Sequence, residues 1–166
     1  MFERLNTPEE LYNFKLGAAL KMEHTVLEML DDNAEAANDP KLASLFRHHQ
    51  DETREQIANL EKAFAALGWE VEDSPCPAIE GIEKEGKATV KKADDAVVDD
   101  VLLSGAAETE HHEIAVYEGL IIHAHAMGKG DVVGLLKQNL EQERHTLTEV
   151  QEATEKAAAA SSGQLA

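Results

Sequence analysis

The 166-residue chain carries 33 acidic and 15 basic side chains, which gives it a formal net charge of −18. Such a charge repels phosphates and anionic lipids, so nucleic acid and membrane surfaces are not expected partners, whereas metal cations are attracted. The single cysteine, Cys76, excludes an intramolecular disulfide framework and a cysteine-rich zinc or iron–sulfur site. The start, MFERLNTPEE, contains no apolar signal segment, and no apolar run reaches the roughly 18 residues of a membrane span, so we expect a cytoplasmic protein.

The first half of the chain predicts two long helices joined by a short link. The stretch Thr7-Pro8-Glu9-Glu10 combines a capping box with proline at the first helical position, which predicts a helix from Pro8 to about Ala37. Asn38-Asp39-Pro40 repeats this start signal, and the second helix is expected to end near Gly68.

The second half begins with a different kind of segment. Residues 69–96 contain prolines and glycines with weak apolar periodicity, and they predict a crossover with one short helix around residues 78–92. A third long helix is expected over about 97–127, ending at Gly128-Lys129-Gly130, and a fourth from Asp131 to about Lys156. Residues 161–166 are expected to form a flexible C-terminal tail.

These connections predict a single all-α domain over residues 1–160. Short links make two antiparallel hairpins, and the long crossover lets the second hairpin lie beside the first. The expected fold is therefore a ferritin-like four-helix bundle whose long crossover carries a short extra helix between helices 2 and 3. The hairpins also resemble each other, with Glu23-His24 matching Glu110-His111, and Leu45 and Glu52 matching Leu136 and Glu143.

Each long helix places glutamate on its apolar stripe, close to the midpoint of the helix. A core-facing stripe advances in steps of three and four residues, and in a bundle of similar-length helices the midpoints share one level. The carboxylates that fall on these stripes are Glu23, Glu52, Glu110, Glu113 and Glu143. We therefore expect five carboxylates to converge in the middle of the core.

A convergence of this kind requires positive charge, because several buried carboxylates cannot all ionise without neutralising cations. Glutamates that bridge two divalent or trivalent metal ions supply it in known four-helix bundles. The alternative is that helix rotation places some of these acids on the surface, paired with Arg54 or Arg144, since E-x-x-E pairs arise freely in a chain with 33 acidic residues.

Nitrogen ligands are less clearly marked than the carboxylates. The usual dinuclear pattern is E-x-x-H on two helices, but here Glu52 is followed by Glu55 and Glu143 by Thr146. His49 lies one turn before Glu52 and is either a metal ligand or a core histidine. Glu55 is a possible supplementary ligand, and Gln56 is placed to hydrogen-bond a ligating carboxylate.

Tyr117 lies one turn after Glu113, so its hydroxyl is expected to reach the same level of the bundle. It is our candidate catalytic residue, as a hydrogen-bond donor or a redox participant. The alternative is a core aromatic side chain whose hydroxyl is satisfied.

The chain resembles the YciE/YciF family of bacterial ferritin-like proteins, which is linked to stress responses. The matching stretches are LYNFKLGAALKMEHTVLEML, FRHHQDETREQI, CPAIEGIEKEG, ETEHHEIAVYEGL and LLKQNLEQERHTL. The resemblance implies a bundle related to rubrerythrin and ferritin, often dimeric, with a di-iron or di-manganese centre. It carries metal-ligand candidacy to Glu23, Glu52, Glu110, Glu113 and Glu143. The cysteine quartet of rubredoxin-type partners is absent from the sequence.

Two functional hypotheses follow from these observations. The first is a non-haem protein with two iron ions, or manganese in their place, that oxidises Fe(II) or removes peroxide during a stress response. The second is a stress-induced binding or scaffold bundle in which the metal site is vestigial and the acidic surface engages a partner.

Overall fold

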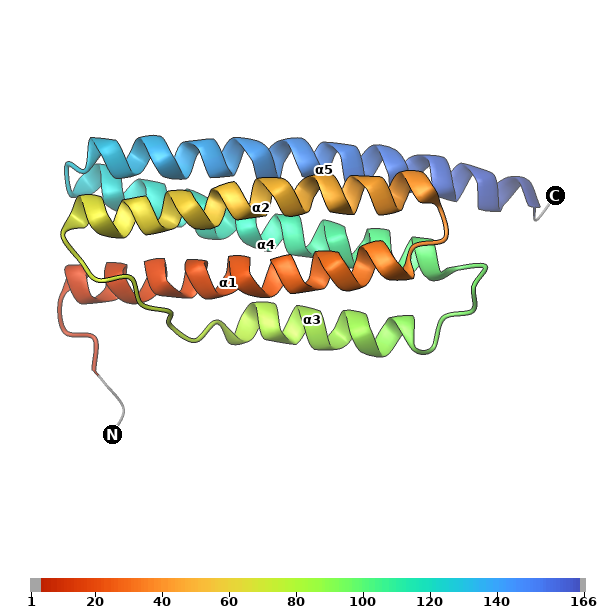
Figure 1. The fold of residues 1–166 in the computed structure, drawn as a ribbon, viewed down its shortest axis with the longest axis horizontal. Helices are drawn as coiled ribbons and strands as arrows, with labels where there is room; N and C mark the ends of the chain where they lie inside the picture. Colours follow the sequence, from red (N-terminus) through yellow and green to blue (C-terminus); the bar gives the residue numbers. More distant parts are fainter. Residues whose placement is uncertain (1–3, 165–166) are drawn as a thin grey trace.

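The computed structural model describes residues 4–164, with side-chain placement for residues 4–160. Every regular element in this part of the chain is a helix (Figure 1). The helices are α1 (Pro8–Ala36), α2 (Pro40–Leu67), α3 (Pro77–Val90), α4 (Val98–Ala126) and α5 (Gly130–Gln164). Across residues 4–164 there is no helix with both the length and the apolar character that crossing a membrane requires.

The helix starts in the first hairpin follow the local signals in the sequence. The Thr7 hydroxyl accepts a hydrogen bond from the Glu10 amide at 3.1 Å, and the Glu10 carboxylate accepts one from the Thr7 amide at 3.2 Å. Asp39 caps α2 by accepting from the Lys41 amide at 2.8 Å. At the other end of α2, Gly68 adopts the left-handed conformation, with φ of 74°, which ends the helix.

The last helix is longer than the sequence predicts. It continues to Gln164, whereas its end was expected near Lys156. Four alanines, residues 157–160, have the highest intrinsic helix propensity and continue the helix without a capping signal. Residues 161–164 of the expected tail therefore lie in α5, and residues 165–166 lie outside the described residues.

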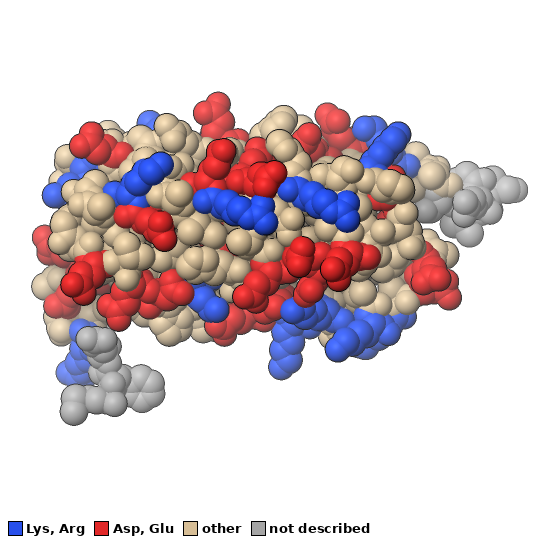
Figure 2. All heavy atoms as spheres, in the orientation of Figure 1, with Lys and Arg blue, Asp and Glu red and all other residues tan. Residues whose placement is uncertain are grey.

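The four long helices form the predicted bundle, and α3 packs on its outer side. Helices α1 and α2 form one antiparallel hairpin, α4 and α5 the other, and the hairpins meet where α2 contacts α5 and α1 contacts α4. The crossover helix α3 lies against α1 and α4 (Figure 1). On the face drawn in Figure 2, acidic side chains are spread along the bundle, while the lysines of α3 gather at its lower edge.

Apolar side chains fill the bundle at the levels above and below its middle. Phe46 and Leu30 are buried toward one end, and Leu60 and Phe64 toward the other. Between them lies a level of buried polar side chains, which the core could not contain without compensating interactions.

Gly17 of α1 lies in close contact with the backbone of the crossover. A Cβ atom placed there would lie 2.6 Å from the Glu72 carbonyl oxygen and 2.6 Å from the Ser74 hydroxyl. We expect Gly17→Ala to lower the free energy of unfolding by about 1–3 kcal/mol, because the backbone of the crossover must shift. Thermal unfolding followed by circular dichroism measures this loss. Gly81→Ala in α3, where a Cβ meets no atom within 4 Å, is the control and is expected to be neutral or stabilising.

Candidate metal centre

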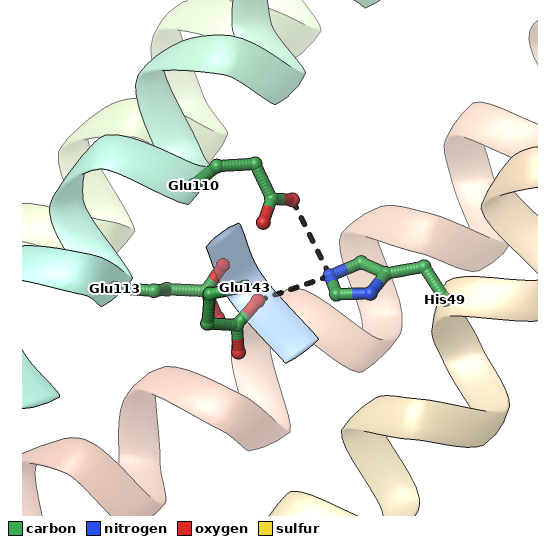
Figure 3. Close-up of side chains that lie close together, drawn as sticks. All are labelled: His49, Glu110, Glu113 and Glu143. Atoms are coloured by element: carbon green, nitrogen blue, oxygen red, sulfur yellow. Dashed lines mark ion pairs between the residues drawn. The ribbon is translucent and has the colours of Figure 1, made fainter. Parts of the chain in front are cut away.

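Four side chains from three helices converge in the middle of the bundle (Figure 3). His49 comes from α2, Glu110 and Glu113 from α4, and Glu143 from α5, and all four are buried. One ligand-type atom from each lies within 4.8 Å of the others. His49 Nε2 lies 3.3 Å from Glu110 Oε1 and 3.6 Å from Glu143 Oε2. Glu110, Glu113 and Glu143, three of the five carboxylates expected to converge, therefore lie at one level of the core together with His49.

Glu23 brings a fifth buried side chain from the remaining long helix, α1. Its Oε1 accepts a hydrogen bond from the Tyr117 hydroxyl, and its Oε2 has no hydrogen-bond partner. Tyr117 is fully buried and also accepts a hydrogen bond from Asn139 Nδ2 at 3.0 Å. The prediction that the Tyr117 hydroxyl reaches this level of the bundle is therefore confirmed, and the group that it contacts is the Glu23 carboxylate.

Glu52 lies at the edge of this group, with 16% of its side chain exposed. Its Oε2 is 3.2 Å from His49 Nδ1 and accepts a hydrogen bond from the Thr146 hydroxyl at 3.3 Å. The Thr146 hydroxyl is in turn 3.1 Å from His49 Nδ1. Glu52 and Thr146 thus hold the imidazole with Nε2 turned toward Glu110 and Glu143, which is how ligating histidines are commonly oriented.

The structure also shows which residues of α2 face inward. The burial pattern of α2 repeats in α5 at an interval of 90 residues, so that Thr53 corresponds to Glu143 and Gln56 to Thr146. The matching of Glu52 with Glu143 in the sequence was therefore off by one residue. The positions usually occupied by E-x-x-H hold T-x-x-Q in α2 and E-x-x-T in α5.

The two remaining candidates on α2 behave differently. Glu55 is exposed, and its carboxylate accepts a hydrogen bond from Gln142 at 3.1 Å on the surface. Gln56 is fully buried, yet both polar atoms of its side chain lack a hydrogen-bond partner. The hydrogen bond expected from Gln56 to a carboxylate is absent, while the position of Gln56 facing the core is confirmed.

Buried ligand-type atoms without hydrogen-bond partners are concentrated at this centre. They are Oε2 of Glu23, Nε2 of His49, Oε2 of Glu110, and both carboxylate oxygens of Glu113 and Glu143. Buried polar atoms in native proteins are nearly always hydrogen-bonded, so a cluster of exceptions requires an explanation. Carboxylate oxygens with one imidazole nitrogen are a donor set that suits iron or manganese, and the residues present therefore fit a metal site.

The protonation of these groups reflects burial and mutual repulsion. Burial raises the pKa of Glu23 to about 7. Burial and the neighbouring carboxylates raise the pKa of Glu113 and of Glu143 well above the usual range. For His49, burial lowers the pKa, but Glu110, Glu52 and Glu143 outweigh it and raise the pKa overall. The hydrogen bond with His49 lowers the pKa of Glu52. Without a cation, the centre therefore retains protons at neutral pH.

Sequence reasoning missed the role of Asn139 and Thr146. Asn139 is fully buried. Besides its hydrogen bond to Tyr117, its side chain donates to the backbone carbonyl oxygen of Gln56 at 3.2 Å and accepts from the Asn59 side chain at 2.9 Å. The sequence does indicate that both residues face the centre, because Asn139, Glu143 and Thr146 are spaced by four and three residues and so lie on one face of α5.

Comparisons with known proteins agree with this architecture. The sequence profile of the family described as "Domain of unknown function (DUF892)" matches residues 7–162. Protein YciF of Escherichia coli K12 is 28% identical over 144 residues, which are 86% of this chain and 87% of YciF.

Solved structures of similar proteins share this fold. YcfI from Rhodopseudomonas palustris superposes with a TM-score of 0.88 at 32% identity, covering 91% of this chain and 97% of that one. The structure of the E. coli stress protein YciF also gives a TM-score of 0.88, at 26% identity, covering 93% and 99%. A protein from Xanthomonas campestris, at 21% identity and a TM-score of 0.74, shares the fold over 95% of this chain and 98% of its own.

Proposed function

The chain belongs to the DUF892 family, and on this premise we propose that it is a non-haem protein with two metal ions, iron or manganese, that reacts with oxygen species in a stress response. The description of its relative YciF as a stress protein supports the biological setting. The proposal also includes the homodimer that the resemblance to the YciE/YciF family implies and the cytoplasmic location expected from the sequence.

The observation that carries this proposal is the burial of the Glu113 and Glu143 carboxylates without hydrogen-bond partners. Both carboxylates are fully buried, and none of their four oxygens has a hydrogen-bond partner. Four buried carboxylates, with Glu23 and Glu110 included, face a single buried imidazole at this level. When ionised, these four carboxylates carry four negative charges, which one imidazolium at His49 does not balance and two divalent cations would.

The residues have distinct proposed roles. The proposed metal ligands are Glu23, His49, Glu110, Glu113 and Glu143. The contact of Glu52 with His49 Nδ1 supports a role for Glu52 in orienting the imidazole. Adjacent metal ions held by these residues would supply electron exchange with dioxygen or peroxide. Tyr117 holds Glu23 through its hydroxyl, and Asn139 holds Tyr117, so the position of the Glu23 carboxylate is fixed from α4 and α5.

Metal analysis of the purified protein tests the proposal. Protein loaded anaerobically with Fe(II) or Mn(II) and desalted without chelator is expected to hold about two ions per chain by mass spectrometry of the metals. The double variant Glu110→Gln/Glu143→Gln is expected to hold none above background, because half of the buried carboxylates are neutral. Glu108→Gln, on the exposed face of α4, is the matched control and is expected to match the wild type.

A wild-type protein that stays substoichiometric after anaerobic loading would contradict the proposal and favour the binding or scaffold bundle. If loading succeeds, Fe(II) oxidation and peroxide consumption are the assays that identify the reaction.

A further inference from the structure

An open groove lies between α1, α3 and α4, with a volume of about 290 Å³. Its walls are mainly apolar, with Met29, Ile82, Val101 and Leu102 among them. At the rim, Lys87 of α3 forms an ion pair with Asp32 of α1 at 3.0 Å and another with Glu83 of its own helix at 2.7 Å. The acidic lining residues, Asp32 and Glu83, are matched by the basic ones, Lys87 and Lys91. The groove is therefore close to neutral on a protein whose net charge is −18.

A second, much smaller cavity lies deeper, beside the candidate metal centre. Its volume is about 10 Å³, roughly the space of one water molecule. His49, Glu110 and Thr146 line it on one side, and Met29 and Asn33 line both this cavity and the outer groove. Met29 and Asn33 are therefore the side chains that the two spaces share, and of these methionine is the more easily rearranged.

We propose that this groove is the route by which a small uncharged oxidant, dioxygen or hydrogen peroxide, reaches the candidate metal centre, with the Met29 side chain as its gate. The inference rests on the proposed function. Apolar walls and a balanced rim suit a neutral molecule, whereas a cation would lose its hydration along them without gaining a charged partner. Glu52, whose carboxylate is partly exposed and touches His49, offers cations a separate approach between α2 and α5.

The chain contains a matched pair of positions for testing the route. Gly105 lines the groove, and a Cβ atom placed there meets no atom within 4 Å. Gly119, on the same helix, lines a groove of about 240 Å³ between α1 and α4, and a Cβ there is equally free. No residue of that second groove lines the inner cavity. Gly105→Leu therefore narrows the proposed route, while Gly119→Leu makes the same change where no route is proposed.

The first test needs no metal. Metal-free protein is treated with hydrogen peroxide, which transfers one oxygen atom to a methionine thioether and leaves as water, and peptide mass spectrometry follows the sulfoxides. We expect Met29 to be oxidised faster than Met22, which is fully buried in the core. Gly105→Leu should slow the oxidation of Met29 about tenfold, and Gly119→Leu should leave it unchanged. Equal rates at Met29 in both variants would overturn the route.

The second test uses protein loaded with Fe(II) under anaerobic conditions. Stopped-flow absorbance after mixing with dioxygen is expected to show oxidation about tenfold slower in Gly105→Leu, with metal content and anaerobic loading rate unchanged. Met29→Ala, which widens the gate, should speed oxidation and keeps the test decisive if Gly105→Leu folds poorly. Slower anaerobic loading in Gly105→Leu would overturn the proposal, because the groove would then admit cations.

The two proposals fail in different ways. Wild-type protein that takes up no metal would overturn the proposed function, and the groove would then lead to no metal centre. Wild-type protein that binds metal, with equal oxidation rates in Gly105→Leu and Gly119→Leu, would overturn the route alone.

Discussion

Glu113→Gln is expected to make the metal-free protein more stable while removing its ability to hold metal. Both oxygens of Glu113 are buried without hydrogen-bond partners among like charges, and its pKa is raised well above the usual range. An amide of the same shape removes the charge that burial and the neighbouring carboxylates oppose, so we expect a stabilisation on the order of 1 kcal/mol or more at pH 8. If Glu113 holds metal as we propose, the same change removes a ligand, and metal affinity should fall on the order of 100-fold or more.

Chemical denaturation at pH 8 and metal analysis measure the two effects on the same samples. Alkaline pH is chosen because the carboxyl group of the wild type is then closest to ionised. The control is again Glu108→Gln, which changes an exposed glutamate of α4 and should alter neither quantity. A variant that was destabilised without metal and still bound it would show that Glu113 is structural and that the proposed ligand set is wrong.

The metal-free protein is also expected to lose stability as the pH rises from about 4.5 to 8. A carboxyl group whose pKa is higher in the folded than in the unfolded chain binds more protons when folded, so raising the pH favours unfolding. Glu23, with its pKa raised from 4.5 to about 7, alone contributes a loss on the order of 3 kcal/mol by pH 8. Glu113 and Glu143 act in the same direction. So does His49, whose raised pKa favours the charged folded form until the pH exceeds that value.

Melting temperatures at several pH values, with and without metal, test this dependence. Bound cations displace the retained protons, so the loaded protein should show little of the decline, and metal binding near pH 7 should release protons measurable by calorimetry in two buffers. Glu23→Gln in the metal-free protein should make the loss of stability with rising pH smaller. This result distinguishes the titration of the centre from general repulsion among the surface acids, which the variant leaves in place. A metal-free protein whose stability increased over this range would contradict the protonation that we describe.

The fold could be predicted from the sequence because most of its helix boundaries depend on local sequence signals. Thr7-Pro8 and Asp39-Pro40 begin helices wherever the rest of the chain lies, and Gly68 ends one by its left-handed conformation. The end of α5 could not be predicted in this way. No capping residue marks it, and an alanine-rich segment is compatible with both a helix and a frayed end.

The candidate centre was predicted in part, for a reason that lies in helix geometry. Neighbouring residues differ by about 100° around a helix axis, and steps of three and four leave the orientation of a stripe uncertain by about that amount. In α4 the stripe was correct, and Glu110, Glu113 and Tyr117 all face the core. In α2 the prediction included Glu52 where the structure has Thr53 facing inward. Packing against α5 decides between the two, and a single sequence does not contain that information.

The distribution of the proposed ligands between the two hairpins has a consequence for the lifetime of the protein. Glu23 and His49 belong to the first hairpin, and Glu110, Glu113 and Glu143 to the second. Bound ions would therefore link the halves of the molecule, and this link would be lost with them. Because proteases act on chains that open, scarcity of metal would shorten the survival of this protein. Its abundance would then follow the supply of the metal it uses.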